Sequence, residues 1–203
     1  MTRLLQSLSN LFHPLLTLTY VALAICLFTP MVHTALATRA FVVGLIAFYT
    51  LVLPCIIIGI MHLFRVVGHW ALRDRRDRAI PFFTNFVCYL VCALVLQRYH
   101  FFPAWFMIAF YGSTLVAFVM WIVSFWWKIS AHAAANASGA TYFLLLSFLF
   151  PDQVPVWLPL LAVIITGAIC SIRLYLGRHT LLQVTLGSLL GLVAITGMAV
   201  ALL

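Results

Sequence analysis

The sequence predicts an all-α bundle of about seven transmembrane helices, and three observations support that prediction. Hydrophobic residues make up 66% of the 203 residues and charged residues only 7%, whereas a soluble domain carries about 25% charged residues. Long apolar runs, most of them near the roughly 20 residues that cross a bilayer as a helix, alternate with short polar segments. Nearly all Lys and Arg residues lie in those polar segments or at their edges. We therefore expect one integral membrane domain, residues 1–203.

The apolar runs define the expected spans in order. Residues 1–12 are short and weakly amphipathic, which suits the membrane interface. Pro54 predicts a kink or tilt in the long second span, and the small, polar residues 131–139 must pack against protein rather than lipid. Gly187 and Gly191 form a face for close helix packing. The predicted spans are residues 13–33, 40–67, 82–97, 103–126, 131–150, 156–176 and 180–203.

Charge and cysteine usage exclude several classes of function. The net charge is +8, but the basic residues are confined to short loops, so anionic lipid headgroups and phosphates are the expected partners rather than nucleic acid. The five cysteines lie in or beside apolar runs without a CxxC pair, and three acidic residues cannot build a metal cage. We expect no cofactor and no metal site.

Three polar clusters are predicted to share one face of the membrane. They lie at residues 73–78, 128–132 and 173–179. Two spans separate each cluster from the next, and two crossings return the chain to the same side. An arginine in a membrane segment usually faces a partner or a wet cavity, and arginine holds phosphate oxygens with a bidentate fork. The three clusters are better explained by one phosphate site than by three unrelated loops.

The order of these clusters resembles the type 2 phosphatidic acid phosphatase family, which shares its site with vanadium haloperoxidases. The family motifs run K-x6-R-P, P-S-G-H and S-R-x5-H-x3-D. Arg173 and His179 have the spacing of the third motif, and the segment 173–179 closely matches R-x-Y-L-G-x-H. Ile172 replaces the family Ser, and Gln183 replaces the family Asp that orients the nucleophilic imidazole. Gln183 can accept a hydrogen bond from the ring, but it supplies no negative charge.

The first two motifs are reduced. Ser130 and His132 of Ile-Ser-Ala-His keep the working positions of the second motif. In the first motif Pro81 matches, but Ile80 stands where the family has Arg. The nearby arginines offer substitutes. Arg75 and Arg78 share a helix face at i,i+3 and are favoured as phosphate ligands, with Arg73, at the family Lys position, the runner-up.

The resemblance implies a metal-free phosphatase. His179 would attack phosphorus, and His132 would protonate the leaving oxygen. Arg173, Arg75, Arg78 and Lys128 would bind the phosphate oxygens, with Ser130 as a further donor. Residues 1–68 would form two N-terminal spans, and residues 69–190 the phosphatase-like core of a haloperoxidase-like helical bundle.

Three functions were weighed. The expected one is removal of phosphate from a lipid phosphate or diphosphate through a phosphohistidine. The alternative is a weak or inactive pseudophosphatase that binds anionic lipid phosphates, which Ile80 and Gln183 favour. Anion transport would need inverted repeats and broken helices, which the sequence lacks. The resemblance implies a multi-pass protein of the bacterial inner membrane. The distribution of basic residues points to the cytoplasm and the family to the periplasm, so the side of the site stays open.

Overall fold

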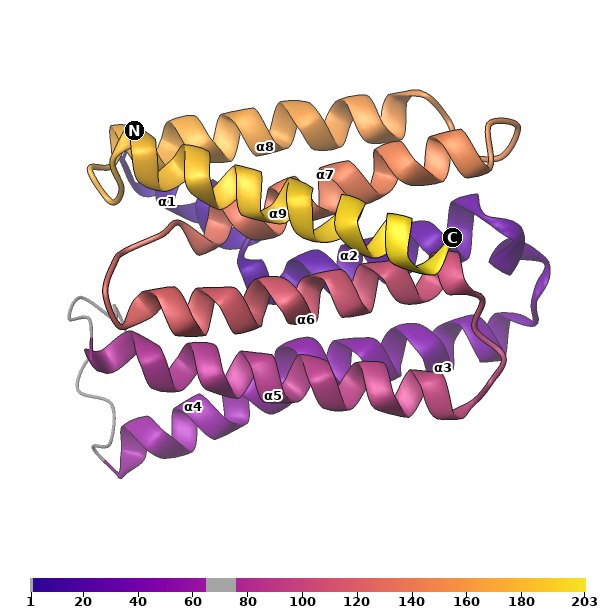
Figure 1. The fold of residues 1–203 in the computed structure, drawn as a ribbon, viewed down its shortest axis with the longest axis horizontal. Coiled ribbons are helices and arrows are strands. Elements are labelled where there is room, and N and C mark those ends of the chain that lie inside the picture. Colours follow the sequence, from indigo (N-terminus) through magenta and orange to yellow (C-terminus); the bar gives the residue numbers. More distant parts are fainter. Residues whose placement is uncertain (1, 65–75) are drawn as a thin grey trace.

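The computed structural model describes residues 2–64 and 76–203, except for the side chains of residues 76–78. The described chain is helical and contains no strand (Figure 1). This confirms the predicted all-α fold class. The helices are α1 (Thr2–Leu11), α2 (Pro14–Phe28), η1 (Pro30–His33), α3 (Leu36–Ala47), η2 (Phe48–Val52), α4 (Leu53–Leu63), α5 (Arg76–Arg98), α6 (Ala104–Ser124), α7 (Ala131–Leu149), α8 (Trp157–Tyr175) and α9 (Leu181–Leu202).

Local chemistry explains where most helices begin. Pro14 is the first residue of α2, where a missing N–H costs nothing, and the His13 ring accepts the N–H of Leu15 at 3.3 Å. Ser130 caps α7, and Thr180 caps α9 with a full capping box. These starts lie within one residue of the predicted spans that open at residues 131 and 180.

The predicted second span is one long segment, Leu36–Leu63, interrupted by the π-turn η2. The π-turn lies directly before Pro54, which has no N–H to donate to the preceding turn. The Thr50 hydroxyl donates a hydrogen bond to the carbonyl of Ile46 at 2.9 Å. The irregularity expected at Pro54 therefore takes the form of a π-turn.

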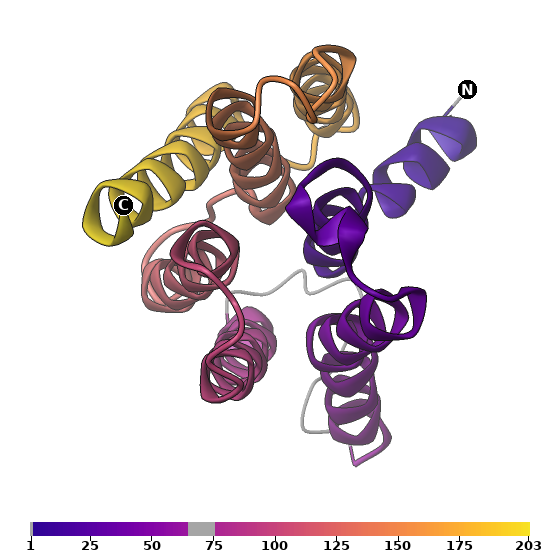
Figure 2. The same ribbon diagram turned by 90° about the vertical axis from the view of Figure 1, so that its right-hand side faces the viewer.

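Helix α7 occupies the centre of the bundle and packs against α2, α6, α8 and α9 (Figure 2). Its closest neighbour is α9. A Cβ atom on Gly187 would lie 2.7 Å from the carbonyl oxygen of Ser130, and one on Gly191 would collide with the backbone of Ala134 and Ser138. The two glycines therefore let the backbones of α7 and α9 approach closely, as the small-residue spacing indicated.

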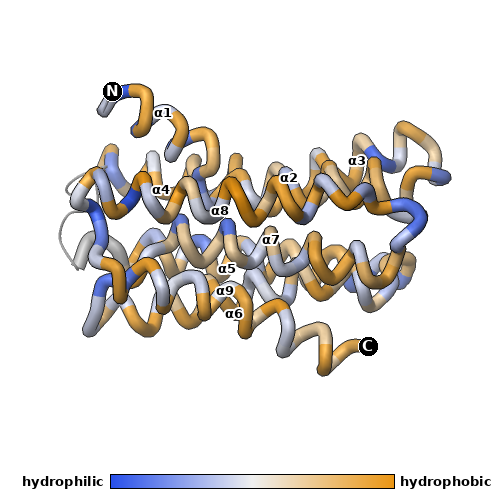
Figure 3. Tube along the Cα trace, turned by 90° about the horizontal axis from the view of Figure 1, so that it is seen from above, coloured by the Kyte–Doolittle hydropathy of each residue, from blue (hydrophilic) through white to orange (hydrophobic). Residues whose placement is uncertain are grey.

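Among the residues that the structure describes, five helical segments are long and apolar enough to cross a membrane, and the pair α1–α2, bent by 53°, would make six. Hydrophilic residues gather at the two ends of the bundle (Figure 3). Helix α7 is not one of the candidates, because its first half is rich in small and polar residues, which lowers its mean hydropathy. The apolar helices indicate an integral membrane protein, while the count of seven spans stays a prediction.

One end of the bundle carries the polar clusters. Helix α5 begins there, and the α6–α7 and α8–α9 connections lie at the same end, on the side of the N-terminus (Figure 1). The C-terminus lies at the opposite end. The second and third clusters therefore share one face of the bundle.

Candidate active site

The loops that carry the second and third motifs are tied together by two hydrogen bonds. The backbone N–H of Ser130 donates to the carbonyl of Gln183 at 3.2 Å. The Lys128 ammonium donates to the carbonyl of Arg178 at 2.6 Å. Residues about 50 positions apart in the chain thus form one cluster, which we call the His/Arg site: Lys128, Ser130, His132, Arg173, His179 and Gln183.

The spacing from Arg173 to His179 is set by a glycine turn at the end of α8. Gly177 has a φ of +61°, the left-handed conformation that glycine adopts without strain. The N–H of Gly177 donates to the carbonyl of Leu174 at 2.9 Å, and that of Arg178 to the carbonyl of Arg173 at 3.1 Å. This pair of bonds is a Schellman motif. It reverses the chain within one turn, so that His179 returns towards Arg173.

His179 is oriented by Gln183, one turn into α9. The distance from His179 Nδ1 to Gln183 Oε1 is 3.2 Å. The same oxygen accepts the backbone N–H of Thr180 at 3.2 Å, while the Thr180 hydroxyl accepts the N–H of Gln183 at 3.4 Å. The Gln183 side chain therefore both caps the helix and contacts the imidazole. The spacing Thr-x-x-Gln is a capping-box signature that the motif comparison overlooked.

His132 and Arg173 form the inner part of the site. Arg173, His13 and His179 all interact electrostatically with His132. His132 Nε2 and Arg173 Nε are buried without a hydrogen-bond partner among the described residues. Buried polar atoms are normally paired, and these two belong to residues that interact electrostatically, so they are candidates to contact a bound group. Arg173 Nε can donate to such a group, and His132 Nε2 can accept a proton from it or return one.

The surroundings of Arg173 suit an anion. Asp152 is the single acidic side chain that the structure describes, and it lies in the α7–α8 connection at the far end of the bundle. Arg173 donates instead to a neutral hydroxyl, Ser9 Oγ, at 3.3 Å. A half-buried guanidinium with no carboxylate partner among the described side chains is a ready site for phosphate. Among the described residues, no three His, Cys, Asp or Glu side chains are grouped as metal ligands would be.

Ser130 has a structural role as the N-cap of α7, besides its expected role as a donor to phosphate. Its side chain is fully buried, and its Oγ accepts the N–H of Ala133 at 3.4 Å as the N-cap of α7. The hydroxyl hydrogen stays available to donate. A donation from Ser130 to phosphate is compatible with this geometry and stays a prediction.

The arginines expected from the first motif are largely outside the described residues. Arg73 and Arg75 belong to residues 65–75, and Arg78 lies in the first turn of α5 without a described side chain. Helix α5 begins at the same end of the bundle as the His/Arg site (Figure 1). The role of these arginines stays a prediction.

Two residues of the site were missed by the sequence analysis because they lie in the first 13 residues. The hydroxyl of Ser9 is buried and accepts from Arg173, 164 positions away. The His13 ring meets the His132 ring edge to face, with centroids 5.3 Å apart. Asn136 joins the same region, since its amide donates to the carbonyls of Phe12 and His132 at 3.2 and 2.8 Å. Helix α1 therefore covers the site from the side of α8.

Comparison with known proteins gave one match. A family model described as the PAP2 superfamily matches residues 123–202, a range that holds every member of the His/Arg site. Neither the curated proteins nor the solved structures gave a match. The PAP2 family generally consists of phosphatases, which indicates phosphatase-type activity for this chain. The family match agrees with the assignment that the motifs predicted: residues 123–202, less than half of the chain, are similar to the PAP2 superfamily.

Proposed function

We propose that this protein is an integral membrane phosphatase that removes phosphate from an amphiphilic lipid phosphate or diphosphate, without a metal ion and through a phosphohistidine. The observation that carries the proposal is the contact between His179 and Gln183. It lies in the same cluster as two buried polar atoms, Arg173 Nε and His132 Nε2, that have no partner among the described residues.

The contact with Gln183 determines which imidazole nitrogen acts. A backbone N–H donates to Gln183 Oε1, so this atom is the carbonyl oxygen of the amide, an acceptor. His179 Nδ1 must then carry the hydrogen of this pair. The lone pair of neutral His179 is therefore on Nε2, which is the nucleophile.

The proposed reaction has two steps. In the first, His179 Nε2 forms a bond to phosphorus while the bond to the leaving oxygen breaks, and His132 donates a proton to that oxygen. In the second, the oxygen of a water molecule bonds to phosphorus while the bond from phosphorus to His179 Nε2 breaks, His132 takes up the proton of the water, and inorganic phosphate leaves with neutral His179 restored. Arg173 neutralises the phosphate oxygens, with Lys128, Ser130, Arg75 and Arg78 as further ligands and Arg73 as the alternative to the last two. The negative charge of bound phosphate also favours protonation of His132 beside Arg173.

A second candidate function is binding without turnover. Gln183 Oε1 is neutral and is shared between His179 Nδ1 and the Thr180 N–H. It offers no charge to stabilise the imidazolium character that develops during attack. A pseudophosphatase that holds anionic lipid phosphates would have the same Arg173 and His132 geometry.

Phosphate release separates the two candidates. The purified full chain in detergent is given phosphatidic acid, phosphatidylglycerophosphate and a polyprenyl diphosphate, with His179→Ala as the matched control. We expect release from at least one lipid by the wild-type protein and none by His179→Ala, because loss of a covalent nucleophile removes the pathway. Equal binding of these lipids by both proteins, with no release by either, would favour the pseudophosphatase.

A further inference from the structure

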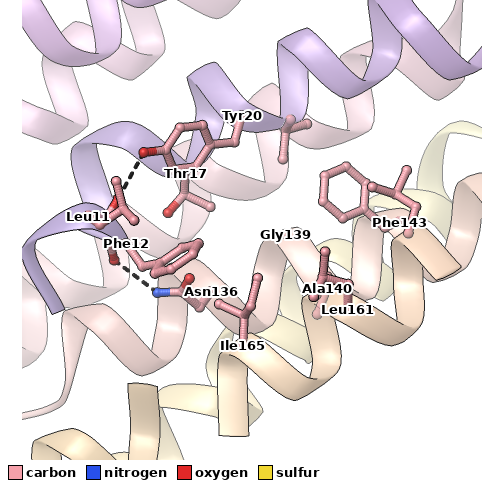
Figure 4. Close-up of a pocket in the computed structure, with 13 residues that line it drawn as sticks. Leu11, Phe12, Thr17, Tyr20, Asn136, Gly139, Ala140, Phe143, Leu161 and Ile165 are labelled. Carbon is pink, nitrogen blue, oxygen red and sulfur yellow. Dashed lines mark hydrogen bonds between the residues drawn. The ribbon is translucent and has the colours of Figure 1, made fainter. Parts of the chain in front are cut away.

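A cavity of about 370 Å³ lies beside the His/Arg site, between α2, α7 and α8 (Figure 4). Its walls are mostly hydrocarbon, because the side chains of Tyr20 and Asn136 are hydrogen-bonded to the main chain and Thr17 is the one other polar residue in the described lining. The Tyr20 hydroxyl donates to the carbonyl of Leu11 at 2.8 Å, and Asn136 donates to Phe12 and His132. Ligand pockets in proteins have volumes of this order, and an apolar cavity of this kind excludes water.

The packing of the helices explains why the cavity exists. Helices α2 and α8 both pack closely on α7, but they do not pack closely on each other in the described chain. At the end near the site, α1 packs on α8. At the other end, the Phe28 and Trp157 rings meet edge to face with centroids 5.5 Å apart. The space between α2 and α8 is therefore bordered by α1 near the site and by these two rings at the other end, and it is partly open along its side, where Leu161 is 46% exposed.

The near end of the cavity adjoins the first turn of α7, which carries His132. Asn136 and Phe12 line its near end, and the amide of Asn136 contacts the carbonyl of His132. Phe143 and Leu158 line its far end. From His132 to Phe143 the distance along α7 is about three helical turns. A long alkyl chain attached to a phosphate at Arg173 can reach along this path, whereas a four-carbon chain ends near Asn136.

We propose that this cavity holds one hydrocarbon chain of the phosphorylated lipid while its phosphate lies in the His/Arg site. The inference rests on the proposed function for the identity of the headgroup. The occupant is an amphiphile because two different surfaces adjoin at α1 and the first turn of α7. The apolar cavity suits a hydrocarbon chain, and the cationic site with its unpaired polar atoms suits a phosphate. The side opening between α2 and α8 lets the chain enter from the lipid phase.

Chain-length selectivity tests the proposal. Ala162 lines the cavity from α8, and Ala168 on the same helix is exposed. Ala162→Phe should fill the cavity and lower the ratio of kcat/KM for dodecyl phosphate to that for butyl phosphate by about tenfold or more. Ala168→Phe, the matched control, should keep the wild-type ratio. An unchanged ratio in Ala162→Phe would overturn the inference.

A binding measurement covers the case in which a variant fails to fold. Wild-type protein is photolabelled with dodecyl phosphate that carries a diazirine at its terminal carbon, and with the matching dodecanol probe. We expect the phosphate probe to label the far end of the cavity, at Phe143 or Leu158, and to do so more strongly than dodecanol. Labelling outside the cavity, or equal labelling by both probes, would refute the chain site. Cavity labelling by the phosphate probe without phosphate release from any substrate would instead refute the catalytic proposal and leave the chain site standing.

Discussion

The contact between Gln183 and His179 can be tested by a substitution that replaces the amide of Gln183 by a carboxylate and should alter catalysis without altering the fold. Gln183→Glu keeps the length of the side chain, so a carboxylate oxygen can occupy the position of Oε1, 3.2 Å from His179 Nδ1. Glu also keeps the capping box with Thr180, and a negative charge in the first turn of α9 is favourable to the helix. The free energy of unfolding should therefore be unchanged or slightly raised.

The expected gain in rate follows from electrostatics. A unit charge about 4 Å from a full positive charge contributes about 4 kcal/mol at an effective dielectric constant of about 20. Only part of that charge has developed on the imidazole in the transition state, and partial burial of the carboxylate offsets some of the gain. About 1.4–2.8 kcal/mol should remain, which corresponds to a tenfold to hundredfold higher kcat.

Three further variants make the test specific. Gln183→Leu removes the acceptor and should lower kcat by about tenfold to hundredfold, the range seen when groups that orient a functional histidine are lost. It should also destabilise α9 by about 1 kcal/mol. Gln183→Asp restores the family residue, but its side chain is shorter, so it should raise kcat less than Gln183→Glu does. Gln153→Glu, an exposed position at the far end of the bundle, should leave kcat unchanged. Phosphate release and thermal unfolding are measured for each protein. A folded Gln183→Leu as active as wild type, or a Gln183→Glu no faster than Gln153→Glu, would refute the proposed role of this contact.

The remaining predictions concern the acid, the metal and the packing. His132→Ala should slow hydrolysis of an alkyl phosphate more than that of a diphosphate, because a phosphate leaving group needs less protonation; an equal loss in kcat for both would contradict its role as the acid. Activity should persist in EDTA and be inhibited by vanadate, which adopts the trigonal-bipyramidal geometry of the transition state; restoration by Mg²⁺ after loss in EDTA would rule out the metal-free mechanism. Gly191→Ala should lower the free energy of unfolding by about 1–3 kcal/mol, because its Cβ would meet the α7 backbone, whereas Gly197→Ala, with nothing within 4 Å of its Cβ, should not; thermal unfolding in detergent compares them, and equal stability would refute the close contact.

Local features of the fold and site could be predicted from the sequence. A bilayer requires helices that satisfy their own backbone hydrogen bonds over a fixed length, so apolar runs and prolines define most helices to within a few residues. Helix α5 is the exception, because it begins at Arg76, before the expected start at residue 82, and contains Pro81. The Arg173–His179 turn is also local, because Gly177 and the backbone bonds around it determine the spacing. The reach of the Gln183 side chain back towards residues 179 and 180 follows from the capping box that Thr180 and Gln183 form at the start of α9.

Contacts between distant residues were decided by the tertiary structure alone. Ser9 and His13 enter the site because α1 bends by 53° from α2 and packs on α8, and no pattern within the first 13 residues specifies that direction. The cavity between α2, α7 and α8 depends likewise on α2 and α8 packing closely on α7 but not on each other. In a membrane the apolar surfaces of helices resemble one another and the surrounding lipid. Sequence hydrophobicity therefore determines that helices form. Which helices pack together is determined by close-packed small residues, such as Gly187 and Gly191, and by a few polar contacts.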